Sequence, residues 1–137
     1  MSVAPDPDEI YDRAVQEGKR RLDQPLLELV ATSFVAGFTI VFGIAALGIV
    51  HAAVQPQFGQ VAHVAGALTF GVGMVFLVAG RAELFTENFF DPVATVIESD
   101  SRGIAALLRL WVVTLVLNLV GGALFVFVLS VDGALPR

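Results

Sequence analysis

No Asp, Glu, Lys or Arg occurs in the 52 residues from 29 to 80. Uncharged runs of 18 or more residues are typical of helices that cross a membrane, because hydrocarbon does not solvate charge. The whole chain is 56% hydrophobic and 15% charged, and its mean hydropathy of +0.80 lies outside the usual range of soluble domains. We therefore predict an all-α membrane protein whose first partner is the lipid bilayer.

The apolar part of the chain divides into three candidate spans. Residues 29–50 would form a helix about 33 Å long, enough to cross a hydrocarbon core about 30 Å thick. A polar stretch at 51–60, which contains Pro56, is expected to form a turn. The second uncharged run follows from residue 61, and the third span is expected at about 104–131.

A helix that ran without interruption from 61 to 98 would be about 57 Å long, nearly twice the thickness of the core. The second span is therefore expected to break, near residues 83–88. Thr86 or Asn88 can cap a new helix there, and Pro92 is tolerated in its first turn.

Residues 1–24 are polar and precede the first span. Ile10, Ala14, Gly18 and Leu22 recur at a spacing of four, which predicts an amphipathic helix. Basic side chains precede the first and third spans, and none lies in 51–60, so the positive-inside rule places the N-terminus in the cytoplasm. We expect a multi-pass protein of the plasma membrane, with a cytoplasmic helix at 1–24 and a membrane unit at 25–137.

Phe70, Met74 and Arg81 would share one face of a helix that continues from the second span. One interpretation is a narrow apolar passage lined by Phe70 and Met74, leading to a helix break and to Arg81, which attract an anion. The alternative is ordinary packing between helices. Arg81, Glu83 and Glu87 can face either an internal cavity or the cytoplasmic interface, and hydropathy does not decide between the two.

Several classes of function are excluded or disfavoured. The net charge of −5 argues against binding of nucleic acid, which requires clustered Lys and Arg. Motifs of hydrolases, metalloproteases and phosphate-binding loops are missing, so the chain is not expected to be an enzyme. With no cysteine and two isolated histidines, no metal or cofactor is expected. Asn118 is expected to form hydrogen bonds between helices.

The run GALTFGVGMVFLVAGRAELFTEN at 66–88 resembles the second membrane segment of the formate/nitrite transporter family. A further N-x-x-G pattern starts at Asn118. The resemblance implies an aquaporin-like fold, of which this chain would be one three-segment repeat with a broken second helix. It also implies an oligomer, a homopentamer in the family, that conducts small monovalent anions such as formate, nitrite or hydrosulfide. By resemblance, Phe70 and Met74 are constriction residues, and the loop of the broken helix comprises Glu83, Leu84, Phe85, Thr86 and Asn88.

The sequence departs from the family pattern in two ways. Arg81 and Glu87 stand where many members have small residues, which indicates a divergent branch whose anion need not be formate. The second inverted repeat and its central histidine are not in this sequence. The chain is therefore expected either to pair with a second three-segment half, or to be a half-length or truncated membrane subunit with an assembly role and no transport by itself.

Overall fold

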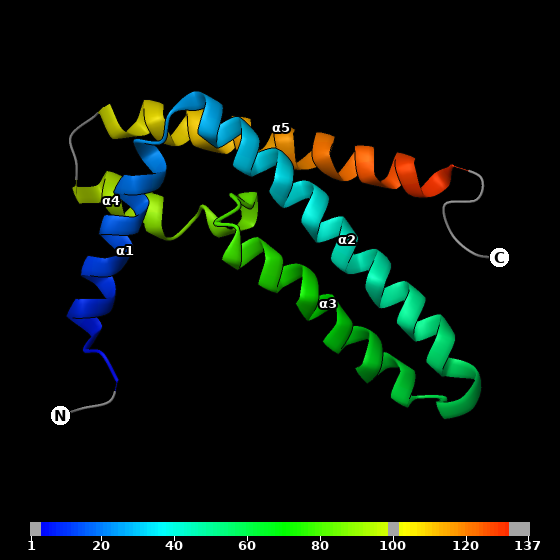
Figure 1. The fold of residues 1–137 in the computed structure, drawn as a ribbon. Coiled ribbons are helices and arrows are strands. Elements are labelled where there is room, and N and C mark those ends of the chain that lie inside the picture. The colour runs from blue at the N-terminus through cyan, green and yellow to red at the C-terminus, as the bar shows by residue number, and fades with distance from the viewer. Residues whose placement is uncertain (1–3, 99–101, 132–137) are drawn as a thin grey trace.

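The computed structural model describes residues 4–98 and 102–131, and every regular element in them is helical (Figure 1). The order along the chain is α1 (Pro7–Leu22), α2 (Leu26–Phe58), α3 (Val61–Ala79), a 3-10 turn η1 (Phe85–Glu87), α4 (Asp91–Glu98) and α5 (Arg102–Ser130).

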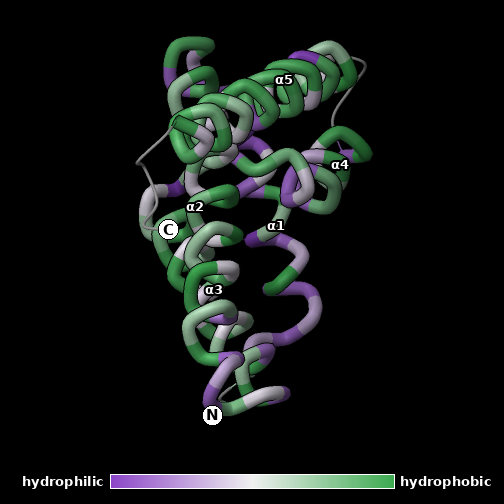
Figure 2. Tube along the Cα trace, turned by 90° about the vertical axis from the view of Figure 1, so that its right-hand side faces the viewer, coloured by the Kyte–Doolittle hydropathy of each residue, from purple (hydrophilic) through white to green (hydrophobic). Residues whose placement is uncertain are grey.

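Three of these helices are long and apolar enough to cross a membrane. They are Leu26–Phe58, Val61–Ala79 and Gly103–Ser130, with mean hydropathies of 2.3, 2.0 and 2.6. The tube in Figure 2 is green, for hydrophobic residues, over much of these helices, and apolar side chains on their outer surfaces such as Leu27 and Leu68 are more than 70% exposed. Such surfaces are stable in hydrocarbon. The prediction of an all-α membrane protein is thus confirmed.

Glycines allow α2 to pack closely against both other spans. Gly73 of α3 meets Gly43 of α2, and a Cβ added to Gly73 would lie 2.8 Å from the Gly43 Cα. On α5, a Cβ at Gly121 would overlap the backbone of α2, just as one at Gly37 of α2 would overlap the backbone of Asn118. Close backbone approach of this kind stabilises helix pairs in membranes. α2 is therefore the central helix, and α3 and α5 diverge on either side of it (Figure 1).

The turn predicted at 51–60 is wrong. α2 continues to Phe58, and only Gly59 and Gln60 separate it from α3. Pro56 lies in the last turn of α2, where its missing N–H costs the helix a single hydrogen bond near its end. Gly59 provides the change of direction with a φ of 51°.

The break of the second span extends over residues 80–90, so it is wider than the predicted 83–88. α3 ends in a Schellman motif, in which the N–H of Ala82 donates to the Leu77 carbonyl (3.0 Å) and the N–H of Arg81 donates to the Val78 carbonyl (3.1 Å). The left-handed position of this motif is usually glycine, but here it is Arg81, with a φ of 47°. Gly80 stands one residue too early for that position.

α1 and α4 pack together beside the break (Figure 1). α1 has Pro7 and two acidic residues in its first turn, and its basic residues lie in its last turn, an order that suits the helix dipole. Ala14, Gly18 and Leu22 are buried, whereas Ile10 in the first turn is exposed. The hydroxyl of Thr95 on α4 donates to the Val15 carbonyl, so α4 fixes α1 across the break.

Candidate functional site at the break of the second span

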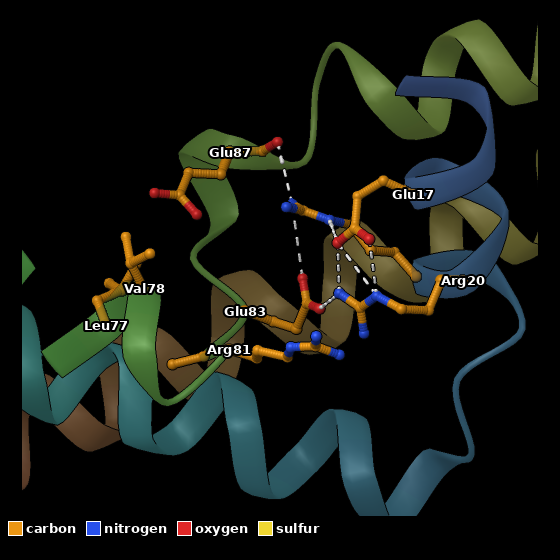
Figure 3. A pocket seen from close by; sticks show the side chains of 9 residues that line it. Glu17, Arg20, Leu77, Val78, Arg81, Glu83 and Glu87 are labelled. Atoms are coloured by element: carbon orange, nitrogen blue, oxygen red, sulfur yellow. Dashed lines mark hydrogen bonds and ion pairs between the residues drawn. The ribbon is translucent and has the colours of Figure 1, made fainter. Parts of the chain in front are cut away.

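Glu83 is the buried ionisable group at the centre of the break. Its side chain is only 1% exposed. Its Oε1 accepts a hydrogen bond of 3.0 Å from Arg20 Nη2, and its Oε2 lies 3.7 Å from Arg21 Nη1. A carboxylate is costly to bury unless it is paired, so the two arginines of α1 make this position tenable. Figure 3 shows the Glu83 side chain pointing toward the guanidinium group of Arg20.

Glu17 completes this ion-pair cluster from one turn earlier on α1. Its Oε1 lies 2.6 Å from Arg20 Nη2 and 3.2 Å from Arg21 Nε. The hydrogen bond from Arg20 lowers the pKa of Glu17 below its ordinary range. The same contact, helped by Glu83, raises the pKa of Arg20. Arg20 therefore stays charged, and carboxylates lie within ion-pair distance of both arginines.

Asn88 fixes the far side of the break and is fully buried. Its Oδ1 accepts a hydrogen bond of 2.8 Å from Arg21 Nη1, and its Nδ2 donates to the Leu84 carbonyl. Trp111 on α5 donates from its indole N–H to the Asn88 carbonyl at 2.7 Å. α1, the break and α5 are thus joined at one residue.

Asn118 on α5 joins the break to α2. Its Oδ1 accepts the N–H of Phe85 at 2.8 Å. Its Nδ2 donates to the carbonyls of Ser33 (2.7 Å) and Glu83 (3.1 Å). The amide therefore satisfies three backbone groups that the irregular segment and α2 would otherwise leave unpaired in an apolar surrounding.

A cavity of about 260 Å³ opens beside the break, between α1 and the end of α3 (Figure 3). It is lined by Glu17, Arg20, Arg21, Leu77, Val78, Arg81, Ala82, Glu83 and Glu87. Within the part of the chain that the structure describes, Arg81 and Glu87 are the two lining ionic side chains that form no ion pair. Both are thus available to a solute. Arg81, Glu83 and Glu87 all line this cavity, and the placement of the cavity within the membrane or at its cytoplasmic interface stays a prediction.

The other residues predicted for the loop have different surroundings. Leu84 packs against an apolar cluster of Ala36, Leu77 and Ala82. Phe85 meets Phe89 edge to face, with ring centroids 5.1 Å apart. Thr86 is exposed. Only part of this loop therefore contacts the cavity.

Phe70 and Met74 lie on α3, one helical turn apart and both half-buried. The ring of Phe70 faces α2, since a Cβ added to Gly43 would lie 3.2 Å from Phe70 Cδ2. Neither side chain lines the cavity at the break. Their role as constriction residues stays a prediction.

Sequence reasoning missed Arg20 and Arg21 as residues of this site. They resemble a basic flank of the first span, and Glu83, the partner of Arg20 in the break, lies 63 residues further along the chain. The one available signal was Glu83 itself, because a buried carboxylate requires a cationic partner. Among the described residues, no group of three or more His, Asp or Glu side chains can hold a metal ion.

Comparison with known proteins identifies the family. The family model described as "Formate/nitrite transporter" matches residues 8–136, nearly the whole chain. The chain belongs to the formate/nitrite transporter family. This confirms the resemblance of the segment at 66–88, and members of this family are transporters, not enzymes.

The chain is similar to two bacterial proteins whose sequences are longer than its own. It is 32% identical over 120 residues to the uncharacterized transporter YrhG of Bacillus subtilis, covering 88% of this chain and 44% of YrhG. It is 26% identical over 113 residues to the inner membrane protein YfdC of Escherichia coli, covering 82% of this chain and 36% of YfdC. The chain thus spans less than half the length of either relative. No solved structure matched it.

Proposed function

We propose that the chain conducts small monovalent anions of the formate or nitrite type, as part of an oligomeric channel in the plasma membrane. The observation that carries the proposal is the cavity at the break, in which Arg81 presents a guanidinium group without an ion-pair partner among the described residues. The oligomer is a homopentamer if it follows the family resemblance. The N-terminus and α1 face the cytoplasm, as the distribution of basic residues predicts.

The charges of the cavity favour a monovalent anion. Glu17 and Glu83 largely neutralise Arg20 and Arg21, which leaves a single cation, Arg81, for a solute. One unpaired guanidinium attracts an anion and repels a cation. Glu87 lies in the same cavity with the opposite charge and weakens this attraction, so an anion at Arg81 is held only weakly. Weak binding of this kind is what conduction requires.

Phe70 and Met74 supply the second element of selectivity in this proposal. An apolar constriction removes water from a passing solute, which excludes a strongly hydrated cation more than a weakly hydrated anion. They lie on α3 about 16 and 10 Å before Arg81 at the helical rise of 1.5 Å per residue. The anion would meet the charged cavity and the apolar segment in sequence.

Three membrane-spanning helices are too few to enclose a passage by themselves. The chain covers 44% and 36% of its two named relatives, which supports the proposal that residues 25–137 pair with a second three-segment half. That half can be another chain or an inverted copy of this one. The rival is an assembly subunit that conducts nothing by itself.

Anion flux in proteoliposomes tests the charge argument. We expect the purified protein to pass formate or nitrite but not potassium, and expect Arg81→Gln and Glu87→Gln to change the flux in opposite directions, each about two- to five-fold. Arg13→Gln is the matched control, because Arg13 lies on the exposed part of α1, paired with Glu9. Equal effects of Arg81→Gln and Glu87→Gln would contradict the assignment of the cavity.

A second pair of variants tests the constriction. Phe70→Trp is expected to reduce flux strongly, whereas Phe127→Trp, at a position 67% exposed on α5, is expected to leave it unchanged. Unchanged flux in both would remove Phe70 from the passage. Folded protein that gives no more flux than empty liposomes would favour the assembly role.

A further inference from the structure

A second depression lies at the C-terminal end of α1, between it and α5. It is open, has a volume of about 440 Å³, and is lined by Leu22, Asp23, Ala105, Ala106 and Arg109. None of these residues lines the cavity at the break. It lies where α1 ends and where both α2 and α5 begin, which is the level of the lipid headgroups if these helices cross the membrane.

Arg109 uses only part of its hydrogen-bonding capacity on the protein. Its Nη2 donates to the carbonyls of Leu22 (2.7 Å) and Gln24 (3.0 Å), which ties α5 to the link between α1 and α2. Its Nε is buried without a partner. In the described residues no acidic side chain lies within ion-pair distance of Arg109, so its positive charge is not neutralised.

Asp23 supplies the opposite charge at the other edge of the depression. It is the C-terminal cap of α1, its side chain is exposed, and its backbone N–H donates to the Lys19 carbonyl. Its carboxylate pairs with no cation in residues 4–98 and 103–131, Arg109 included. The depression therefore holds one unpaired cation and one unpaired anion, separated by two alanines that leave space between them.

This arrangement matches a headgroup that carries both charges. We propose that the depression binds a phospholipid whose headgroup contains a phosphate diester and a primary ammonium group. Arg109 donates to the phosphate and Asp23 accepts from the ammonium. An anionic lipid without the ammonium would meet Asp23 as a like charge.

Apolar side chains next to the depression suit the acyl chains of such a lipid. Leu26 and Leu27 begin α2 just after Asp23, and they are 55% and 83% exposed. Ile104 and Leu108 flank the two alanines on α5 and are also more than half exposed. A free headgroup without acyl chains would gain nothing from these contacts, so a lipid is the expected occupant.

Native mass spectrometry of the full-length protein in mild detergent tests the proposal. The probes are phosphatidylethanolamine and phosphatidylglycerol with identical acyl chains, added in equal amounts. We expect the wild type to retain phosphatidylethanolamine in preference, and expect Asp23→Asn to reduce that ratio about two- to five-fold, the size of one partly exposed ion pair. Asp12→Asn removes an exposed carboxylate elsewhere on α1 and should leave the ratio unchanged.

Two further measurements separate a built site from general attraction to lipid. Ala105→Trp fills the depression from its exposed side and should reduce retention of both lipids, whereas Ala123→Trp, exposed near the other end of α5, should not. Soluble glycerophosphoethanolamine should not compete. The proposal is overturned if the wild type shows no preference, if Asp23→Asn keeps the wild-type ratio, or if both tryptophan variants behave alike.

Discussion

The two ends of α3 each have a residue with positive φ, but they differ in what that residue is and in what holds it. At the turn from α2, Gly59 has a φ of 51°, and the uncharged sequence around it contains no ion pair. At the break, Arg81 has a φ of 47°, a conformation that costs a residue with a Cβ about 1 kcal/mol.

The break compensates for this cost with contacts from distant parts of the chain. α1 contributes two arginines, and α5 contributes Asn118 and Trp111. The turn has a glycine and needs no such support. In the proposed function, the arginine at this strained position presents its charge to the cavity, whereas the turn requires only the backbone freedom of its glycine.

The largest effect is expected from Glu83→Ala. The substitution leaves Arg20 and Arg21 without their buried partner, and we expect the free energy of unfolding to fall by about 3 kcal/mol. Titration with a denaturing detergent from mild micelles measures it. Glu9→Ala breaks an ion pair whose side chains are both more than half exposed, and it should cost less than about 0.5 kcal/mol. Similar losses in the two variants would show that the buried cluster contributes no special stability.

The next largest effect is expected from Asn118→Leu. It removes three hydrogen bonds at once and leaves the N–H of Phe85 unpaired, so a loss of about 2 kcal/mol is expected. Hydrogen exchange at the Phe85 amide should become faster. Gln60→Leu alters the turn end, where the Gln60 side chain forms no cap hydrogen bond, and should leave stability nearly unchanged. If exchange at the Phe85 amide stays slow in the Asn118→Leu variant, Asn118 does not hold the backbone of the break in place.

At the turn, Gly59→Ala is expected to cost about 1 kcal/mol, because alanine disfavours positive φ. A Cβ at Gly59 meets nothing within 4 Å, so the cost comes from the backbone alone. Gly48→Ala is the matched control within α2, where a Cβ also meets open space. It should stabilise the protein by about 0.5–1 kcal/mol. Stability is measured by thermal or detergent titration. If Gly59→Ala and Gly48→Ala change the free energy of unfolding in the same direction, the turn does not require its glycine.

Arg81→Gly is expected to raise the free energy of unfolding slightly, by about 0.5 kcal/mol, because glycine accepts the left-handed conformation at lower cost. Anion flux should fall in the same variant. Arg81→Ala removes the charge but keeps the Cβ, so its flux should also fall with no gain in stability. A stable Arg81→Gly variant with full flux would show that the arginine is kept for neither shape nor charge.

Much of the fold follows from the sequence, because the bilayer leaves few alternatives. The three spans, the amphipathic first helix and a break after the second span all follow from hydropathy and length. The ends of the helices are less predictable. The polar stretch with Pro56 predicts a turn at 51–60, and nothing in the pattern marks Arg81 as a left-handed residue, but a proline in a last turn and an arginine with positive φ are both tolerated once other elements hold the backbone.

The candidate site was predictable only in part. Glu83 and Asn88 lie in the segment that carries the family resemblance, and Asn118 was expected to form hydrogen bonds between helices. Their partners could not be read from the sequence, since Arg20 and Arg21 reach Glu83 and Asn88 across more than 60 residues. Spacing along one helix predicts which side chains share a face, but not which distant helix end packs against them.

The smallest expected effect is the change of stability with pH. It concerns the break alone, because the uncharged turn between α2 and α3 has no carboxylate. The hydrogen bond from Arg20 holds the pKa of Glu17 below its ordinary value of 4.5, so the unfolded chain takes up a proton at higher pH than the folded one. The contribution of Glu17 to stability is therefore complete above about pH 4.5 and is lost as the pH falls through the lowered pKa of the folded state. Its side chain is 39% exposed, so solvent screening keeps the effect small.

Glu17→Gln should flatten this part of the stability profile, measured as unfolding midpoints against pH, whereas Asp12→Asn should leave it in place. A profile that is equally steep in the Glu17 variant would place the acid-sensitive contact elsewhere than in the cluster of α1 with the break.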